Sequence, residues 1–146
     1  MVMSRVYFFF LCFFIAFSVT SGGKGLALIV NGKLFHYEVA SFFADHLRVL
    51  DYSIQIWLTQ NNAKNPMMAK AGYEFLQDYA KDIRFLPDHS QAMTKAMELP
   101  RERIKLLVHI NADENTDFRQ LCQLNLHDSL MQKAEKVIMV VHYAGV

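Results

Sequence analysis

Cysteine is nearly absent from this chain of 146 residues, which contains two. Cys12 lies in an apolar stretch near the N-terminus, so Cys122 stands alone in the rest of the sequence. A domain with a single cysteine cannot form an internal disulfide, and its stability must come from its hydrophobic core. Cys122 is then buried and inert, paired with another molecule, or reactive, and burial is the ordinary state of a free cysteine.

An excess of charge of one sign is also lacking. The 15 lysines and arginines nearly balance the 14 acidic residues, which gives a net charge of +1. The sequence shows no basic stripe of the kind that binds nucleic acid. It also shows no lysine-rich amphipathic face of the kind that binds a membrane surface. We therefore expect no nucleic-acid partner.

Motifs that hold phosphates, metals or nucleophiles are missing as well. The segment Asn31 to Phe35 has one glycine where a dinucleotide-binding fingerprint needs three, and no G-x-S-x-G sequence marks a serine nucleophile. No single element carries paired ligand spacing, although the chain has six histidines: His36, His46, His89, His109, His127 and His142. We expect neither a metal nor a cofactor.

The longest hydrophobic run lies at the N-terminus. Met1 to Arg5 carries one positive charge, Val6 to Val19 is almost wholly apolar, and Thr20 to Gly23 supplies small residues. This three-part pattern is typical of a secretory signal peptide, and the run is shorter than the roughly 20 residues of a membrane-spanning helix. We expect cleavage of residues 1–22 and a single exported domain of residues 23–146, periplasmic or secreted, with no stable membrane span. An uncleaved signal anchor is the alternative.

The rest of the chain alternates strand-like and helix-like segments. Strands are predicted where short apolar runs end at turn residues, over 26–30, 53–59, 83–86, 103–110 and 137–141. Helices are predicted from apolar spacing over 39–50, from Pro66 to Tyr79, from Asp88 or Ser90 to Met97, and from an Asn125 N-cap to Ala134. This alternation predicts a three-layer α/β/α domain of flavodoxin-like type with a five-stranded, mostly parallel sheet.

Two of these helices carry more specific predictions. In the first, one face is expected to be buried because its residues fall at three- and four-residue spacing: Val39, Phe42, Phe43, His46, Leu47 and Leu50. In the last, the expected buried stripe is Leu126, Leu130, Met131 and Ala134. The segment before it, Ala112 to Gln123, shows the least regular pattern and is expected to be irregular.

Ligands of a parallel sheet bind beyond the carboxyl ends of its strands, near a switch in strand order. The residues expected at that edge are Asn31, Thr59, Gln60, Asp88, His89, Asn111, His142 and Tyr143. Among them, Asn31, Asp88 and Asn111 are the candidate ligand-binding residues.

Asp88 and His89 form the most suggestive pair at this edge. A histidine beside a carboxylate at a strand end can serve as a general base or bind a ligand. The alternative is that Asp88 caps the next helix and His89 is a solvated residue of its first turn. The segment Asp113 to Asp117 has the oxygen spacing that opens a calcium loop, but Phe118 and Leu124 stand where glycine and glutamate are needed, so a solvated loop is expected.

Several phrases of the sequence resemble the DsrE/DsrF-like family of small α/β proteins. Ala27 to Gly32, leading into Ala40 to Leu47, is similar to the first strand and helix of that family. Ile54 to Leu58 is similar to its second strand, and Leu130 to Met139 to its closing helix, turn and last strand. The resemblance covers most of the chain after the leader and implies the same fold.

Members of that family are associated with sulfur relay and sulfur oxidation, and they often form oligomers. Those that carry sulfur use a cysteine just after the third strand, where this chain has Pro87, Asp88 and His89. The resemblance therefore implies a non-catalytic binding or accessory protein, whose partner is a second copy or another protein. The alternative is a sulfur-relay protein that uses Cys122 as its nucleophile, helped by His89.

Overall fold

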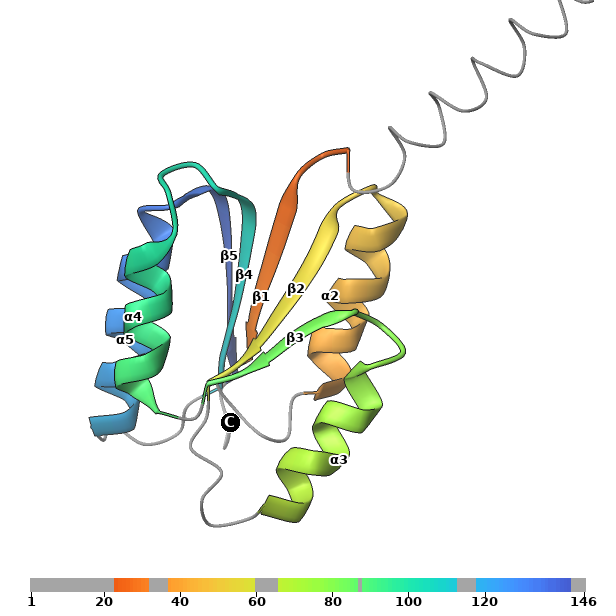
Figure 1. Cartoon of the computed structure of the whole chain (residues 1–146), viewed down its shortest axis with the longest axis horizontal. Coiled ribbons are helices and arrows are strands. Elements are labelled where there is room, and N and C mark those ends of the chain that lie inside the picture. The colour runs from red at the N-terminus through yellow and green to blue at the C-terminus, as the bar shows by residue number, and fades with distance from the viewer. Residues whose placement is uncertain (1–22, 32–36, 60–65, 87, 113–117, 143–146) are drawn as a thin grey trace, which may run out of the picture.

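The computed structural model describes residues 23–31, 37–59, 66–86, 88–112 and 118–142, which are drawn in colour in Figure 1. The predicted leader (1–22) and the acidic segment 113–117 lie outside these ranges, as do Gln60 and Tyr143. No helix in the described ranges has the length and apolarity to cross a membrane. In chain order the elements are β1 (Leu26–Asn31), α2 (Tyr37–Val49), β2 (Ser53–Leu58), α3 (Pro66–Leu76), β3 (Asp82–Phe85), α4 (His89–Glu98), β4 (Ile104–Ala112), α5 (Phe118–Met131) and β5 (Ala134–His142).

The strands form one five-stranded sheet in the order β3-β2-β1-β4-β5, and every neighbouring pair is parallel. Helices α2 and α3 cover one face of the sheet, and α4 and α5 cover the other (Figure 1). The predicted three-layer architecture is confirmed, and it is consistent with a flavodoxin-like fold. The switch in strand order lies between β1 and β4, because the chain leaves β1 toward one edge of the sheet and later leaves β4 toward the other.

β1 lies at the centre of the sheet and is buried along its whole length. Its alternate residues feed two separate cores. Ala27 and Ile29 pack on the side of α2, whereas Leu28 and Val30 pack on the side of α4 and α5. A strand that is covered on both faces needs a continuous apolar run, which is why the predicted strand shows no polar alternation.

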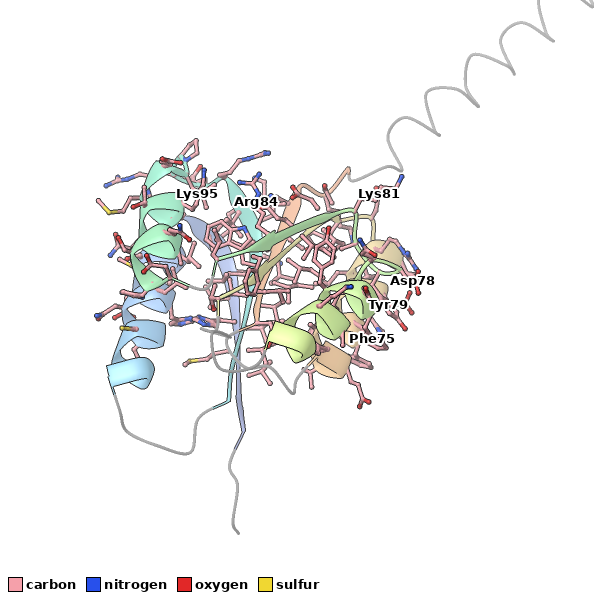
Figure 2. All side chains as sticks on the ribbon, turned by 60° about the horizontal axis from the view of Figure 1, so that its bottom comes forward. Phe75, Asp78, Tyr79, Lys81, Arg84 and Lys95 are labelled. Carbon is pink, nitrogen blue, oxygen red and sulfur yellow. The ribbon has the colours of Figure 1, made fainter. Side chains whose placement is uncertain are left out.

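Helix α3 approaches α2 at a glycine. A Cβ atom built on Gly72 would lie 1.8 Å from Cζ of Tyr37, so the tyrosine ring occupies the space above the glycine. Burial raises the pKa of the Tyr37 hydroxyl, as expected for a ring that is packed between two helices. Beyond this contact, Phe75 lies 5.5 Å from Tyr79 between ring centroids, on the outer side of the domain (Figure 2). Gly72 therefore leaves the space that the ring of Tyr37 occupies between α2 and α3.

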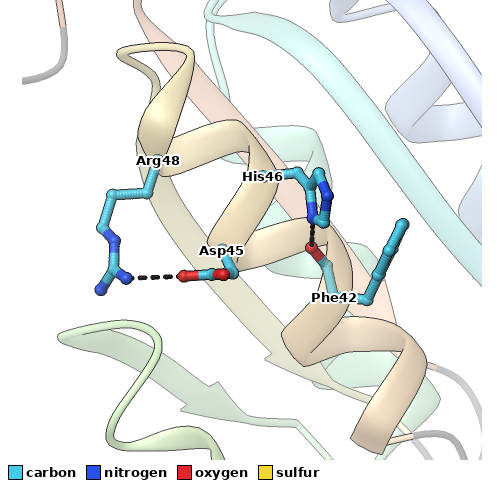
Figure 3. A network of polar contacts seen from close by, with 4 residues as sticks. All are labelled: Phe42, Asp45, His46 and Arg48. Atoms are coloured by element: carbon cyan, nitrogen blue, oxygen red, sulfur yellow. Dashed lines mark hydrogen bonds and ion pairs between the residues drawn. The ribbon is translucent and has the colours of Figure 1, made fainter.

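The predicted buried face of α2 is partly wrong. The helix turns Ala40, Ala44 and Leu47 to the sheet, while Phe42 is 57% exposed and His46 is exposed as well. Small side chains let the helix backbone approach the sheet closely, and the larger aromatic residues are then left on its flank. His46 donates a hydrogen bond from Nδ1 to the carbonyl oxygen of Phe42 at 2.9 Å, and the two rings lie 4.1 Å apart (Figure 3).

The predicted start of the last helix is also wrong. α5 begins at Phe118, so Asn125 is an exposed residue in the middle of the helix rather than its N-cap. Residues 118–123 of the segment that we expected to be irregular therefore form the first turns of α5. Leu126 and Leu130 are buried as predicted, but Met131 is 44% exposed and Ala134 belongs to β5.

Candidate functional site

The carboxyl ends of β1 and β4 meet at the switch in strand order, and Asn31 is the last residue of β1 there. Its side chain is 2% exposed, and its register partners are Leu58 of β2 and Ile110 of β4. Its carbonyl oxygen accepts hydrogen bonds from the backbone N of Thr59 at 3.2 Å and from Thr59 Oγ1 at 3.5 Å. Asn31 and Thr59 are thus buried polar residues that hold the ends of β1 and β2 together.

The three candidate ligand-binding residues are not equally close to one another. Asn111 follows Ile110 in β4, the strand next to Asn31, and neighbouring strands lie about 4.8 Å apart. Asp88 lies beyond the end of β3, at the start of α4, and β3 is two strands away from β1, a spacing of roughly 10 Å across the sheet. The structure therefore brings Asn31 and Asn111 to adjacent strand ends and leaves Asp88 apart.

Asp88 has a structural role at the start of α4. It is the N-cap of that helix, and its carboxylate accepts a hydrogen bond from the backbone N of Ser90 at 3.0 Å. His89 is the half-buried first residue of the helix. The interpretation of Asp88 as a helix cap is confirmed. One oxygen of its carboxylate is bonded to Ser90 and is therefore engaged in the cap rather than with His89.

Cys122 lies near the N-terminal end of α5 and is 8% exposed. Burial raises the pKa of its thiol. A reactive cysteine has a lowered pKa and is partly exposed, because only the thiolate is nucleophilic. Among the described residues, no hydrogen bond joins Cys122 to His89. The surroundings of Cys122 are those of a structural thiol that stays protonated at neutral pH.

The structure contains a buried pair of histidines, between β4 and α5, that the sequence did not reveal. Nδ1 of His109, in β4, lies 3.0 Å from Nδ1 of His127, in α5, and the ring centroids are 5.1 Å apart. His109 is 0% exposed and His127 is 7% exposed. One Nδ1 must donate a proton and the other must accept it, so the two rings cannot both be cations while this bond persists. The pair was missed because its members are 18 residues apart on different elements.

Trp57 and Gln55 of β2 form a second buried polar pair, on the face of the sheet that carries His109. Val30 of β1 has Trp57 and His109 as its two register partners, so these three residues form a row across β2, β1 and β4. Trp57 donates from Nε1 to Oε1 of Gln55 at 2.9 Å, and Gln55 in turn donates from Nε2 to a carboxylate oxygen of Asp82 in β3. The chain of bonds satisfies the indole N–H inside the core.

The two histidines and the pair of Trp57 and Gln55 are joined by buried hydrogen bonds within the core. In the described part of the chain, no three histidine, cysteine, aspartate or glutamate residues gather closely enough to hold a metal ion.

No family model, curated protein or solved structure matches this chain. The resemblance to the DsrE/DsrF-like family therefore remains a prediction from the sequence, and the function has to be inferred from the geometry of these residues.

Proposed function

We propose that residues 23–146 form an exported, non-catalytic binding or accessory domain of DsrE/DsrF-like type. The observation that supports this proposal best is the burial of Cys122, whose thiol has a raised pKa. Sulfur-carrying members of that family have their cysteine just after the third strand, and in this chain that place includes Asp88, the N-cap of α4. Neither position offers a thiolate that could attack a sulfur donor.

Export is the second part of the proposal, and it rests on the N-terminal sequence. A basic start, an apolar run and small residues precede the domain, and this is the order of the regions in a secretory signal peptide. Cleavage would release a domain that acts in the periplasm or outside the cell.

The partner of such a domain is a second copy of the chain or another protein. A small ligand at the carboxyl edge of the sheet would bind near the switch in strand order, where Asn31 ends β1 and Asn111 follows Ile110, the register partner of Asn31 in β4. Asp88 lies further along that edge and is engaged in capping α4. Nucleic acid is not expected as a partner because the net charge is only +1.

A sulfur-loading assay tests the absence of catalysis. A low-molecular-weight persulfide can pass its terminal sulfur to a thiolate, which forms a protein persulfide and releases the thiol of the donor. We expect the folded protein to take up no more sulfur than its Cys122→Ser variant, because burial keeps the Cys122 thiol protonated and covered. The bound sulfur would be measured as cyanide-labile sulfur per chain.

The matched control is the same protein after unfolding in urea, in which Cys122 is accessible and should load. Stoichiometric loading of the folded protein, lost in the Cys122→Ser variant, would contradict the proposal and favour a sulfur-relay protein.

A further inference from the structure

Helix α5 touches the sheet through two histidines whose contact depends on how many protons they bind. Nδ1 of His127 lies 3.0 Å from Nδ1 of His109, and the two residues are 7% and 0% exposed. In the neutral pair one Nδ1 carries a proton and the other accepts the hydrogen bond. A further proton can bind to Nε2 of the donating ring without breaking this bond. Any proton after that must bind to the accepting Nδ1, where it removes the acceptor and places two cations side by side.

The other ionisable residues of the sheet lie at a distance from this pair. β1 has none, and those of β4 and β5 stand near the ends of the strands: Lys105, Glu135, Lys136 and His142. Lys105 is four residues from His109, about 13 Å along the strand, and it is paired with Glu135 at 3.2 Å. The ion pair of Asp82 and Arg84 belongs to β3, three strands away from β4. None of these residues enters the contact between the two Nδ1 atoms.

Helix α4 lies beside α5 on the same face of the sheet (Figure 1). It turns Ala92 and Ala96 inward, and its ionisable residues are half-buried or exposed: His89, Lys95 and Glu98. Lys95 and Glu98 form an ion pair with each other at 3.6 Å. A test of the histidine pair must therefore include His89, the only histidine of α4.

Helix α5 itself adds no buried charge among its described side chains. Asp128 is exposed, and burial raises the pKa of the Cys122 thiol, which is therefore neutral near pH 7. Four described side chains of the helix are buried: Cys122, Leu126, His127 and Leu130. The contact of His127 with His109 is thus a sizeable part of what holds α5 against the sheet.

We propose that the contact of His109 and His127 is acid-sensitive: binding of the last proton parts the two rings, releases α5 from β4 and uncovers Cys122. His109 stays in place, because β4 lies between β1 and β5 in the sheet. His127 has to move instead, and α5 moves with it because the ring is almost wholly covered. Cys122, one and a half turns before His127 on the same helix, is then exposed to solvent.

Acid favours the released state because that state binds more protons than the closed one. A free histidine titrates near pH 6.5, so both rings take up protons below about this pH once they are apart. The closed state excludes at least the last of these protons. Its stability is therefore complete above about pH 7 and falls as the pH drops below about 6.5, by about tenfold in the opening equilibrium per pH unit and excluded proton.

This inference adds control by pH to the proposed function and rests on its covered thiol. The sulfur-loading assay at neutral pH tests whether Cys122 is covered there. The acid-sensitive contact is tested by the change from neutral to acidic pH. Loading at neutral pH would therefore contradict the proposed function alone, whereas a thiol that stays covered in acid would contradict this inference alone.

The rate at which 4,4′-dithiodipyridine labels Cys122 measures the release of α5. The rate in the folded protein is divided by the rate in the urea-unfolded protein at the same pH, so that the pH dependence of the thiol and of the reagent cancels. The label is counted on the peptide that contains Cys122, because Cys12 also reacts wherever the leader is retained. We expect this ratio to rise about tenfold or more from about pH 7.5 to about pH 5.5, since the released state binds at least one proton more.

The His127→Gln variant keeps an amide that can hydrogen-bond to His109 but removes one site of protonation, so the rise should be about tenfold smaller. Because the compared quantity is a ratio between two pH values, a general loss of stability does not imitate this result. His46→Gln, on the exposed flank of α2, and His89→Gln, on α4, are the matched controls and should leave the rise unchanged.

Nitrogen-15 NMR of the imidazole rings gives a second readout that needs no variant. At about pH 7.5 one of the two Nδ1 atoms should carry a proton and the other should not. A wild-type labelling ratio that changes by less than about twofold overturns the proposal. So does an equal rise in His127→Gln, a rise that is lost in His89→Gln, or protonation of both Nδ1 atoms while Cys122 stays covered.

Discussion

Replacement of Trp57 by alanine is expected to lower the free energy of unfolding by about 3–5 kcal/mol, the largest loss among the substitutions considered. Trp57 is 1% exposed and belongs to the core beneath α4 and α5. Its removal leaves a cavity the size of an indole in the row that runs from β2 to β4. It also deprives Oε1 of Gln55 of its donor in a buried position.

Urea unfolding followed by circular dichroism measures this loss, because Trp57 is the only tryptophan and cannot serve as a fluorescent probe in its own absence. The Trp57→Phe variant separates the two causes: it keeps most of the ring volume but removes the N–H donor, so a smaller loss of about 1–3 kcal/mol is expected. Met97→Ala, on the exposed face of α4, should change stability by less than about 0.5 kcal/mol. A Trp57→Ala variant as stable as the wild type would show that Trp57 is not part of the core.

The Gly72→Ala variant is expected to be less stable than the wild type by about 1–2 kcal/mol, although alanine is the better helix former. Alanine at a helical position gains roughly 1 kcal/mol over glycine. The new Cβ, however, would lie 1.8 Å from Cζ and 2.1 Å from Cε2 of Tyr37, far inside contact distance. The ring must therefore leave its site between α2 and α3, and overpacking of this kind costs about 1–3 kcal/mol.

A double-mutant cycle decides whether this contact is responsible. In a Tyr37→Ala background the clash is gone, so Gly72→Ala should become stabilising by up to about 1 kcal/mol through helix propensity alone. Alkaline titration gives a further readout: burial raises the pKa of Tyr37, and a displaced ring in Gly72→Ala should titrate closer to its ordinary pKa of about 10. The same loss of stability in both backgrounds would contradict the contact.

The alternation of strands and helices was predictable because each element has a local signature. β1 is a continuous apolar run that ends at Asn31, and α4 is bounded by the Asp88 cap and by Pro100, which cannot continue a helix. The strand order is not encoded locally, since it depends on which face each connecting helix covers. The sequence therefore predicted a parallel three-layer domain and left its switch point open.

The errors have physical causes that particular residues show. In α2, the large residues Phe42 and His46 suggested a buried face, but the small residues Ala40 and Ala44 form the contact with the sheet. In α5, polar residues interrupt the apolar pattern of the first turns. Asn125 was interpreted as the N-cap, although the helix begins at Phe118. Phe118, Cys122 and Leu126 do follow at four-residue spacing, a signal that could have placed the start correctly.

Where the candidate residues lie on the fold was predictable, but their contacts were not. The carboxyl edge of the sheet follows from the fold class, and Asn31 and Asn111 do lie near the ends of adjacent strands there. The contact between His109 and His127 depends on the packing of α5 against β4, so no local sequence pattern predicts it. The burial of Cys122 has the same origin, because it depends on which side of α5 meets the sheet and α4.

The intact mass of the protein recovered from its exported compartment, with and without reductant, tests the central proposal most directly. An exported domain with an inert thiol predicts a chain that begins near Gly22 or Gly23, with Cys122 unmodified and a mass that reductant does not change. Retention of Met1 would contradict cleavage of the leader. A reducible gain of sulfur-sized mass on Cys122 would contradict the non-catalytic role and make sulfur relay the function to pursue.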